Sequence, residues 1–263
     1  MIDYHIHTHI SGDCDASMMD MAAAAGQKGL REICFTEHID LDVSSNIDFT
    51  IDFDAYRCAF SETRAAYPDI TMRMGIEAGL EMRTKDEMKD IIAANDVDYV
   101  IGSQHIVFGL DPYEPDIWQQ YDQRVIFDEY LRASIECVAA CDFYDMVGHI
   151  GYISKFCPHD DKLMRYSDYR DAVDTLLKTI VQKGKGIEVN TNGLFSVGAT
   201  MPEMPIITRY YELGGRIVTI GSDAHFTGHV GRGVPETLDV LKNIGFEYVC
   251  AFDKRKPRFI PIP

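Results

Sequence analysis

Short apolar runs alternate with longer amphipathic stretches along most of the chain. Each run is about the length of a buried parallel strand. The runs cover residues 2–7, 32–36, 70–77, 98–102, 144–148, 186–190 and 216–221. A further run, residues 246–252, would make an eighth strand. The pattern therefore predicts seven or eight buried strands with longer elements between them.

The stretches between the runs have the periodicity and the end signals of helices. Residues 18–29 follow Ser17, which is a good N-cap residue, and they end at a glycine. Further helices are expected over residues 53–67, 126–142, 169–183 and 205–213. Strands that alternate with helices favour an α/β fold, either a β/α barrel or a doubly wound sheet. Periodicity alone does not choose between these two.

Two longer segments, residues 40–51 and 108–125, are predicted to be loops. Long loops in compact domains are often functional, so these segments are expected to cover a site. The total length of 263 residues allows one or two domains, and β/α barrels of about 250 residues form one domain. The chain shows no linker, repeat or low-complexity stretch. We therefore expect a single domain over residues 1–263.

The charge balance narrows the classes of partner. The chain has 25 basic and 42 acidic residues, a formal net charge of −17. So acidic a surface repels phosphate backbones and anionic lipids, which argues against nucleic-acid and membrane partners. A small anionic substrate remains allowed, because bound metal ions can reverse the charge locally. The oligomeric state stays open.

Cysteine usage indicates the compartment. There are seven cysteines and no CxxC motif, which suits a reducing environment better than a disulfide framework. No apolar run reaches the roughly 18 residues that span a bilayer. The first residues lack the basic and apolar regions of a secretory signal. These observations predict a cytoplasmic protein.

Histidines and acids collect where the predicted strands end. His5 and His7 lie on one face of the first strand, because side chains alternate along a strand. Other strand ends carry His38, Glu77, His105, His149, Asp223 and His225. A lone histidine after a strand is usually structural or solvated. In a parallel sheet or barrel, however, all these ends meet on one face, so we expect the side chains to form one cluster.

A cluster of imidazoles and carboxylates suits Zn, Mn or Fe better than Ca or Mg. It holds too many ligands for one tetrahedral ion and would serve two or three divalent ions. Ions of this kind clamp a phosphate group and generate a metal-bound hydroxide near neutral pH. The predicted chemistry is therefore hydrolysis of a small phosphate ester.

These residues are also where the sequence resembles the polymerase and histidinol phosphatase (PHP) superfamily. The motifs are His5-Ile6-His7, Thr36-Glu37-His38, Gly75-Ile76-Glu77, Ser103-Gln104-His105, Gly148-His149 and Ser222-Asp223-Ala224-His225. They occur in this order, and the resemblance extends from His5 to Gly231. It implies a single PHP-type metallophosphoesterase domain. Its fold would be a distorted (β/α)7 TIM-like barrel with a metal cluster at the C-terminal ends of the strands.

The resemblance also implies a set of metal ligands. The first ion would be held by His5, His7, Glu77 and Asp223. The second would share Glu77 and add His105 and His149. The third would be held by Asp13, His38 and His225. Asp13 departs from family members that have histidine at this position, and its segment Ser11-Gly12-Asp13 is equally typical of a turn.

The chain looks most like the histidinol-phosphatase branch, because of residues 149–155 and 188–193 and the insertions after His38 and His105. That branch hydrolyses L-histidinol phosphate to L-histidinol and phosphate. The first alternative is a PHP phosphoesterase acting on nucleotides or other small phosphate esters. A non-catalytic module, like the PHP domains attached to polymerases, is disfavoured because every ligand position is present. An amide hydrolase with a carboxylated lysine is disfavoured because no strand ends in lysine.

Several residues outside the cluster are candidates for substrate contacts. Lys155 could bind a phosphate oxygen and assist catalysis, and His229 could bind phosphate or protonate the leaving oxygen. Asn192 and Arg165 are weaker candidates for substrate binding, since an Asn-Gly pair is a routine turn and most arginines are solvated. L-Histidinol phosphate also carries an amine and an imidazole. Acids and aromatics of the two long loops could meet these groups: Asp42, Asp48, Asp111, Tyr113, Glu114 and Trp118.

Overall fold

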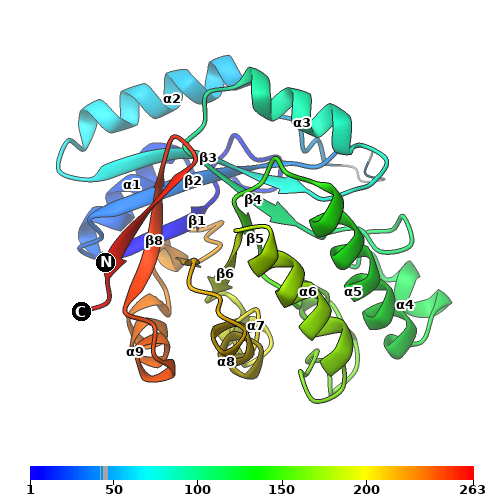
Figure 1. The fold of residues 1–263 in the computed structure, drawn as a ribbon. Helices are drawn as coiled ribbons and strands as arrows, with labels where there is room; N and C mark the ends of the chain where they lie inside the picture. The colour runs from blue at the N-terminus through cyan, green and yellow to red at the C-terminus, as the bar shows by residue number, and fades with distance from the viewer. Residues whose placement is uncertain (42, 44–46) are drawn as a thin grey trace.

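Among the residues that the structure describes (1–41, 43 and 47–263), seven parallel strands form one sheet in chain order (Figure 1). The structure is a computed structural model. The strands are β1 Ile2–Ile6, β2 Glu32–Ile39, β3 Thr71–Gly79, β4 Tyr99–Ser103, β5 Met146–Val147, β6 Gly186–Asn190 and β7 Val218–Gly221. Every predicted run from 2–7 to 216–221 corresponds to one of these strands.

The sheet curls until its two edges meet. Ile6 at the end of β1 forms a parallel bridge with Ala224, just beyond β7. The N–H of His7 donates to the carbonyl of Ala224 at 3.0 Å, and the N–H of Ala224 donates to the carbonyl of His5 at 3.3 Å. The sheet is therefore a nearly closed barrel, and the doubly wound alternative is excluded. The expected distorted (β/α)7 architecture is confirmed.

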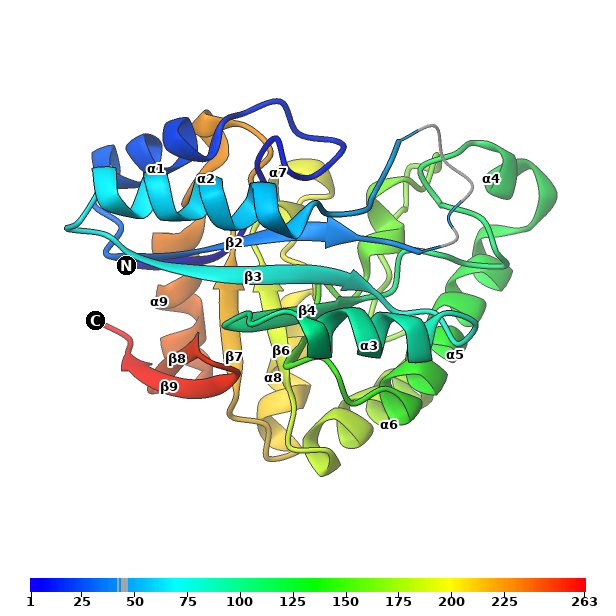
Figure 2. The same ribbon diagram turned by 90° about the horizontal axis from the view of Figure 1, so that it is seen from above.

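Helices cover the outside of the barrel (Figures 1 and 2). They are α1 Met18–Gln27, α2 Phe53–Ala66, α3 Lys85–Ala94, α4 Asp116–Gln120, α5 Gln123–Ala140, α6 Arg170–Gln182, α7 Gly193–Ser196, α8 Met204–Glu212 and α9 Val234–Ile244. As expected, Ser17 caps α1, and its side chain accepts a hydrogen bond from the N–H of Asp20. In the described part of the chain, we find no helix with the length and apolar character needed to cross a membrane.

Among the described residues, four helices and two strands differ from the sequence prediction. The short helices α4 and α7 were not predicted, and α4 lies inside the segment 108–125, which was expected to be a loop. Helix α3 buries only Met88 and Ile92, so its apolar periodicity is weak. Helix α9 buries Val234, Leu238 and Leu241, a helical spacing that could have revealed it. The run 246–252 is not an eighth barrel strand. It forms β8, Tyr248–Asp253, which pairs antiparallel with β9, Lys256–Pro261.

The hairpin of β8 and β9 packs against the end of the barrel where the strands begin. Arg258 binds both carboxylate oxygens of Glu32, the first residue of β2, at 2.6 and 2.7 Å. Arg255 donates to Asp145, just before β5, at 2.5 Å. The N–H of Lys254 donates to Asp98, just before β4, at 3.0 Å. These contacts occupy the amino-terminal end and leave the carboxyl-terminal end of the barrel for the candidate site.

Candidate metal centre

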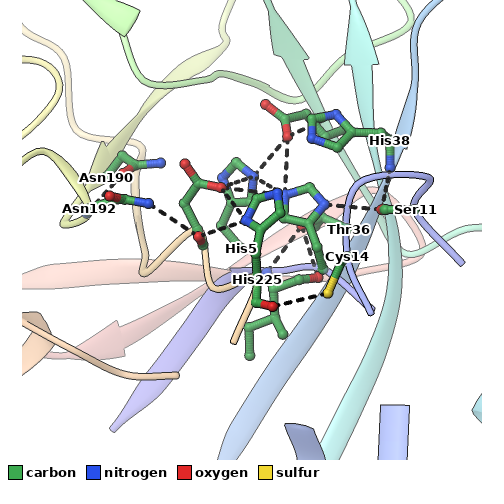
Figure 3. A network of polar contacts seen from close by, with 12 residues as sticks. His5, Ser11, Cys14, Thr36, His38, Asn190, Asn192 and His225 are labelled. Atoms are coloured by element: carbon green, nitrogen blue, oxygen red, sulfur yellow. Dashed lines mark hydrogen bonds and ion pairs between the residues drawn. The ribbon is translucent and has the colours of Figure 1, made fainter. Parts of the chain in front are cut away.

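Histidines and carboxylates from all parts of the barrel converge at its carboxyl-terminal end, as Figure 3 shows for His5, His38 and His225. The parallel pairing of the strands brings them together. For example, His38 of β2 lies in register with Glu77 of β3. The centre of the cluster is inaccessible to solvent, since His5 and His7 are 0% exposed and Glu77 is 1% exposed. Buried polar groups of this kind need partners, because burying an unpaired polar group is costly.

Glu77 occupies the middle of the cluster, and imidazoles surround both of its oxygens. Oε2 lies 2.9 Å from Nε2 of His5 and 3.3 Å from Nε2 of His7. Oε1 lies 2.7 Å from Nε2 of His149 and 3.2 Å from Nε2 of His105. Asp223 lies beside His5 and His7, and its Oδ1 is 3.5 Å from Nε2 of His7. His5 and His7 thus lie at one oxygen of Glu77, and His105 and His149 lie at the other.

Asp13 belongs to a third group and is more than a turn residue. Its Oδ2 lies 3.1 Å from Nε2 of His225 and 3.6 Å from Nε2 of His38. Burial alone would raise the pKa of Asp13. The hydrogen bond to His225 and the charge of His38 nevertheless hold that pKa below its ordinary value. The rings of His38 and His225 each stack on His7 with centroids 4.3 Å apart, so this group is continuous with the first.

The donor set fits divalent transition-metal ions. Three triads have ligand atoms within 4.8 Å of one another: His5–His7–Glu77, His38–Glu77–His105 and His7–His38–His225. Nδ1 of His38 is buried and has no hydrogen-bond partner in the described part of the chain. Its distances to carboxylate oxygens of Glu77 and Asp40 are 3.4 and 3.5 Å, too long for good hydrogen bonds. Imidazole nitrogens and carboxylates that converge in this way are typical of Zn, Mn or Fe sites.

A carboxylate behind His5 was not predicted from the sequence. Glu188 of β6 is 1% exposed, and its Oε1 lies 2.5 Å from Nδ1 of His5. Its Oε2 accepts the N–H of His149 at 2.8 Å. A carboxylate on Nδ1 holds the proton there and leaves Nε2 free as a ligand. The sequence signals were an acid within the buried run 186–190 and the resemblance of residues 188–193 to the histidinol-phosphatase branch, and neither assigned Glu188 a partner.

Two further side chains, Asp40 and Ser11, contact the Nδ1 atoms of imidazoles in the cluster. Asp40 Oδ1 lies 2.8 Å from Nδ1 of His105. Burial would raise the pKa of Asp40, but the charge of His105 lowers it to about 2. Ser11 Oγ lies 3.1 Å from Nδ1 of His7 and donates to Glu37 at 2.7 Å. Asp40 could have been found from its position two residues after His38, directly beyond the end of β2.

A cavity of about 660 Å³ opens above the cluster. Besides cluster residues, its lining includes side chains that the sequence analysis singled out: Lys155, Asn192, His229, Asp111, Tyr113 and Glu114. Burial raises the pKa of Asp223, but the charge of His5 and the hydrogen bond to His7 lower it. Lys155 lies close enough for its charge to lower this pKa further. Burial and the charge of Arg232 lower the pKa of His229, which favours a neutral imidazole at neutral pH.

The comparison with known proteins agrees with this geometry. The PHP domain model matches residues 3–192, most of the chain. The chain belongs to the PHP family. A "probable histidinol-phosphatase" of Clostridium acetobutylicum is 34% identical over 259 residues, which cover 98% of this PHP chain and 99% of that protein. The histidinol-phosphatase of Lactococcus lactis is 27% identical, with coverage of 97% and 95%.

A solved PHP-like structure is similar to this chain over nearly its whole length. It is the histidinol phosphate phosphatase of Lactococcus lactis, complexed with zinc, L-histidinol and phosphate. The TM-score is 0.91 and the identity is 26%, and 98% of each chain is covered.

The PHP barrel brings together all nine residues that the resemblance implies as metal ligands: His5, His7, Asp13, His38, Glu77, His105, His149, Asp223 and His225. Lys155, Asn192 and His229 line the cavity above them. Arg165 is different. The described residues that line the cavity do not include it, and it is 46% exposed and pairs with Asp161 at 2.8 Å. The fold gives its predicted substrate contact no support.

Only some of the loop residues expected to contact the amine and imidazole of the substrate line the cavity. Asp111, Tyr113 and Glu114 line the cavity. Trp118 instead donates from Nε1 to the carbonyl of Pro112 at 2.8 Å, so its role is to hold the loop together. The side chain of Asp48 accepts hydrogen bonds from Thr50 within its own segment. Asp42 lies outside the described residues.

Proposed function

We propose that this chain is a single-domain, metal-dependent phosphomonoester hydrolase that converts L-histidinol phosphate and water to L-histidinol and phosphate. The observation that carries the proposal is the buried imidazole and carboxylate cluster at the floor of the cavity, with Glu77 at its centre. The full-length similarity to histidinol-phosphatases supports the choice of substrate. The similar structure that holds zinc, L-histidinol and phosphate supports both parts of the proposal.

The proposed centre takes two to three divalent ions, Zn, Mn or Fe. His5, His7, Glu77 and Asp223 would hold the first ion. Glu77, His105 and His149 would hold the second, and Asp13, His38 and His225 the third. When bound, such ions place positive charge at the phosphate oxygens and lower the pKa of a water molecule that can attack phosphorus.

The remaining side chains position the substrate. The ammonium group of Lys155 supplies a further positive charge on the wall of the cavity, beside Asp223. A neutral His229 has one N–H that can donate to a phosphate oxygen or to the leaving oxygen. Asn192 donates from Nδ2 to the carbonyl of Asp223 at 3.3 Å, so it also fixes the backbone next to the cluster. In-line attack needs no covalent phosphoenzyme, and no Ser or Cys nucleophile is assigned.

The lining also bears on the alternative substrates. Asp111 and Glu114 place negative charge on the lining of the cavity, in a chain that is already strongly acidic. A nucleoside monophosphate has no cationic group to pair with these carboxylates, and a nucleotide with more phosphates would be repelled by them. A small monoester with a cationic organic part is a better match. The proposed substrate therefore fits this site better than a nucleotide does.

Phosphate release from a panel of esters tests the proposal. The protein would be loaded with Zn²⁺ or Mn²⁺ and offered L-histidinol phosphate, nucleoside monophosphates and p-nitrophenyl phosphate. We expect kcat/KM for L-histidinol phosphate to exceed the others by at least tenfold. Equal or greater kcat/KM for a nucleotide would contradict the substrate assignment but keep the metal chemistry. No hydrolysis of any ester by metal-loaded protein would contradict both.

A further inference from the structure

Glu37 is a buried carboxylate that is not among the proposed metal ligands. It belongs to β2 and is 0% exposed. Its two oxygens accept four hydrogen bonds from the segment that follows β1. The backbone N–H groups of Thr8 and Ser11 donate at 3.0 and 3.2 Å, and the hydroxyl groups of the same two residues donate at 2.6 and 2.7 Å. All four donors are neutral, so Glu37 serves this segment as an acceptor of hydrogen bonds.

The hydroxyl group of Ser11 connects Glu37 to the cluster. Ser11 is 2% exposed, and its Oγ lies 2.7 Å from Oε2 of Glu37, 3.0 Å from the backbone nitrogen of His38 (Figure 3) and 3.1 Å from Nδ1 of His7. A hydroxyl group has one proton to donate and two lone pairs that accept. The N–H of His38 can only donate, so it takes one lone pair. One proton and one lone pair therefore remain for Glu37 and for Nδ1 of His7.

The chemistry of the two partners decides which of them receives the proton of Ser11. A carboxylate has no proton to give, and Glu37 is the nearer of the two groups, so the hydroxyl proton points at Glu37. Nδ1 of His7 then faces a lone pair and must carry the ring proton. A neutral imidazole has only one N–H, so Nε2 of His7 keeps its lone pair. This Nε2 lies 3.3 Å from Oε2 of Glu77 and 3.5 Å from Oδ1 of Asp223, inside the cluster.

We propose that Ser11 is a positioning residue that fixes the tautomer of His7, and that Glu37 sets the direction of the Ser11 hydroxyl group. The nitrogen of His7 that faces the proposed metal centre thereby keeps a free lone pair. Glu188 supports His5 by direct contact, whereas Glu37 supports His7 through a hydroxyl group between them. This inference rests on the proposed function, which makes His7 a metal ligand. It adds a role for a buried acid that touches neither the substrate nor the proposed ions.

The test is nitrogen-15 NMR of the imidazole rings in metal-free protein at mildly alkaline pH, with the His7 signals assigned by their absence from His7→Gln. In the wild type we expect the proton of His7 on Nδ1 and a free Nε2. In Ser11→Ala the proton should move to Nε2, because an N–H there can donate to Glu77, whereas Nδ1–H has lost its acceptor. Zn²⁺ affinity of Ser11→Ala should fall about tenfold, the low end of the range for lost support of a ligating histidine.

Thr8→Val is the matched control, because it removes the other hydroxyl group that donates to Glu37 and keeps nearly the same shape. The second hydrogen bond of that hydroxyl group is to the N–H of Ile10, within the same segment. Both variants should unfold at lower denaturant concentration than the wild type, since each loses a buried hydrogen bond. Thr8→Val alone should keep the proton of His7 on Nδ1 and a Zn²⁺ affinity within about twofold of the wild type.

A proton on Nε2 of His7 in the wild type overturns the inference, and this result needs no variant that folds. Equal losses of Zn²⁺ affinity in Ser11→Ala and Thr8→Val also overturn it, because a purely structural role of the segment would weaken both alike. If the wild type binds no Zn²⁺, the proposed function fails separately. The tautomer of His7 in metal-free wild type and Ser11→Ala then still decides the role of Ser11.

Discussion

Replacing Glu188 with glutamine changes the charge behind His5 while keeping nearly the same shape. One oxygen of Glu188 lies 2.5 Å from Nδ1 of His5, and the other accepts the N–H of His149 at 2.8 Å. Glutamine can satisfy only one of these contacts. If its oxygen faces His149, its amide N–H faces Nδ1 of His5. That nitrogen must then accept, and the ring proton moves to Nε2, the atom that points at Glu77.

The expected loss of metal affinity follows from this move of the ring proton of His5. A proton on Nε2 of His5 removes one of the lone pairs assigned to the first ion. Losing a carboxylate that supports a ligating histidine typically weakens metal binding 10- to 100-fold, which is about 1.4 to 2.8 kcal/mol. Glu188 is 1% exposed, so water cannot replace it, and we expect a value near the upper end. Folding should change less, because no cavity is created.

The assay is a competitive titration of Zn²⁺ against a chromophoric chelator, with circular dichroism to confirm the fold. Glu87→Gln on α3 is the control, because it makes the same chemical change at an exposed residue. The control should bind Zn²⁺ like the wild type. Zinc affinity of Glu188→Gln within a factor of two of the wild type would refute the reasoning.

Three further predictions concern the frame of the site. A Cβ at Gly148 would lie 2.4 Å from Oγ of Ser103, which donates to Glu77 at 2.6 Å. Gly148→Ala should therefore cost about 1–3 kcal/mol in a denaturant titration and weaken Zn²⁺ binding, and a neutral result would count against this packing. Arg255→Ala leaves Asp145 without its cation. We expect a loss of about 2 kcal/mol, because the pair is partly exposed, and an unchanged denaturation midpoint would contradict it. Hydrogen bonds from Arg209 lower the pKa of Asp174 from 3.8, so this carboxylate stabilises the fold above that pH and loses its contribution as pH falls. Asp174→Asn should thus cost about 1 kcal/mol at pH 7, and this cost should shrink as the pH falls below 3.8. A difference that does not depend on pH would exclude this ion pair as the cause.

The ligand cluster was accessible from the sequence because its signals are local. Each of His38, His105 and His149 follows a buried strand directly, and parallel strands carry their ends to one face. The predicted run 186–190 begins and ends at the same residues as β6, because its apolar pattern is also a local signal. Asp13 was ambiguous because a turn and a ligand look alike in sequence, and only its distance to His225 distinguishes them.

The supporting residues were missed because their partners are distant along the chain. Glu188 contacts His5 across 183 residues, and no local pattern announces such a pair. Lys155 and Arg165 are both basic residues beyond the same strand, and the sequence made Arg165 only the weaker candidate. The structure separates them, because Lys155 ends a short 3-10 helix and lines the cavity, whereas Arg165 pairs with Asp161. The prediction of a barrel strand over residues 246–252 was wrong for a similar reason. Their strand is apolar enough for a barrel, yet it pairs with β9, in which two prolines weaken the strand signal.

The central claim is that the cluster holds the ions that make this chain a phosphatase. It is tested most directly by titrating metal-free protein with Zn²⁺ while following phosphate release from L-histidinol phosphate. The account predicts no turnover without metal and full turnover only after two to three equivalents of Zn²⁺ per chain. It also predicts that His105→Ala stays folded but gains no turnover at any Zn²⁺ concentration. Turnover by the metal-free protein, or wild-type turnover in His105→Ala, would contradict it.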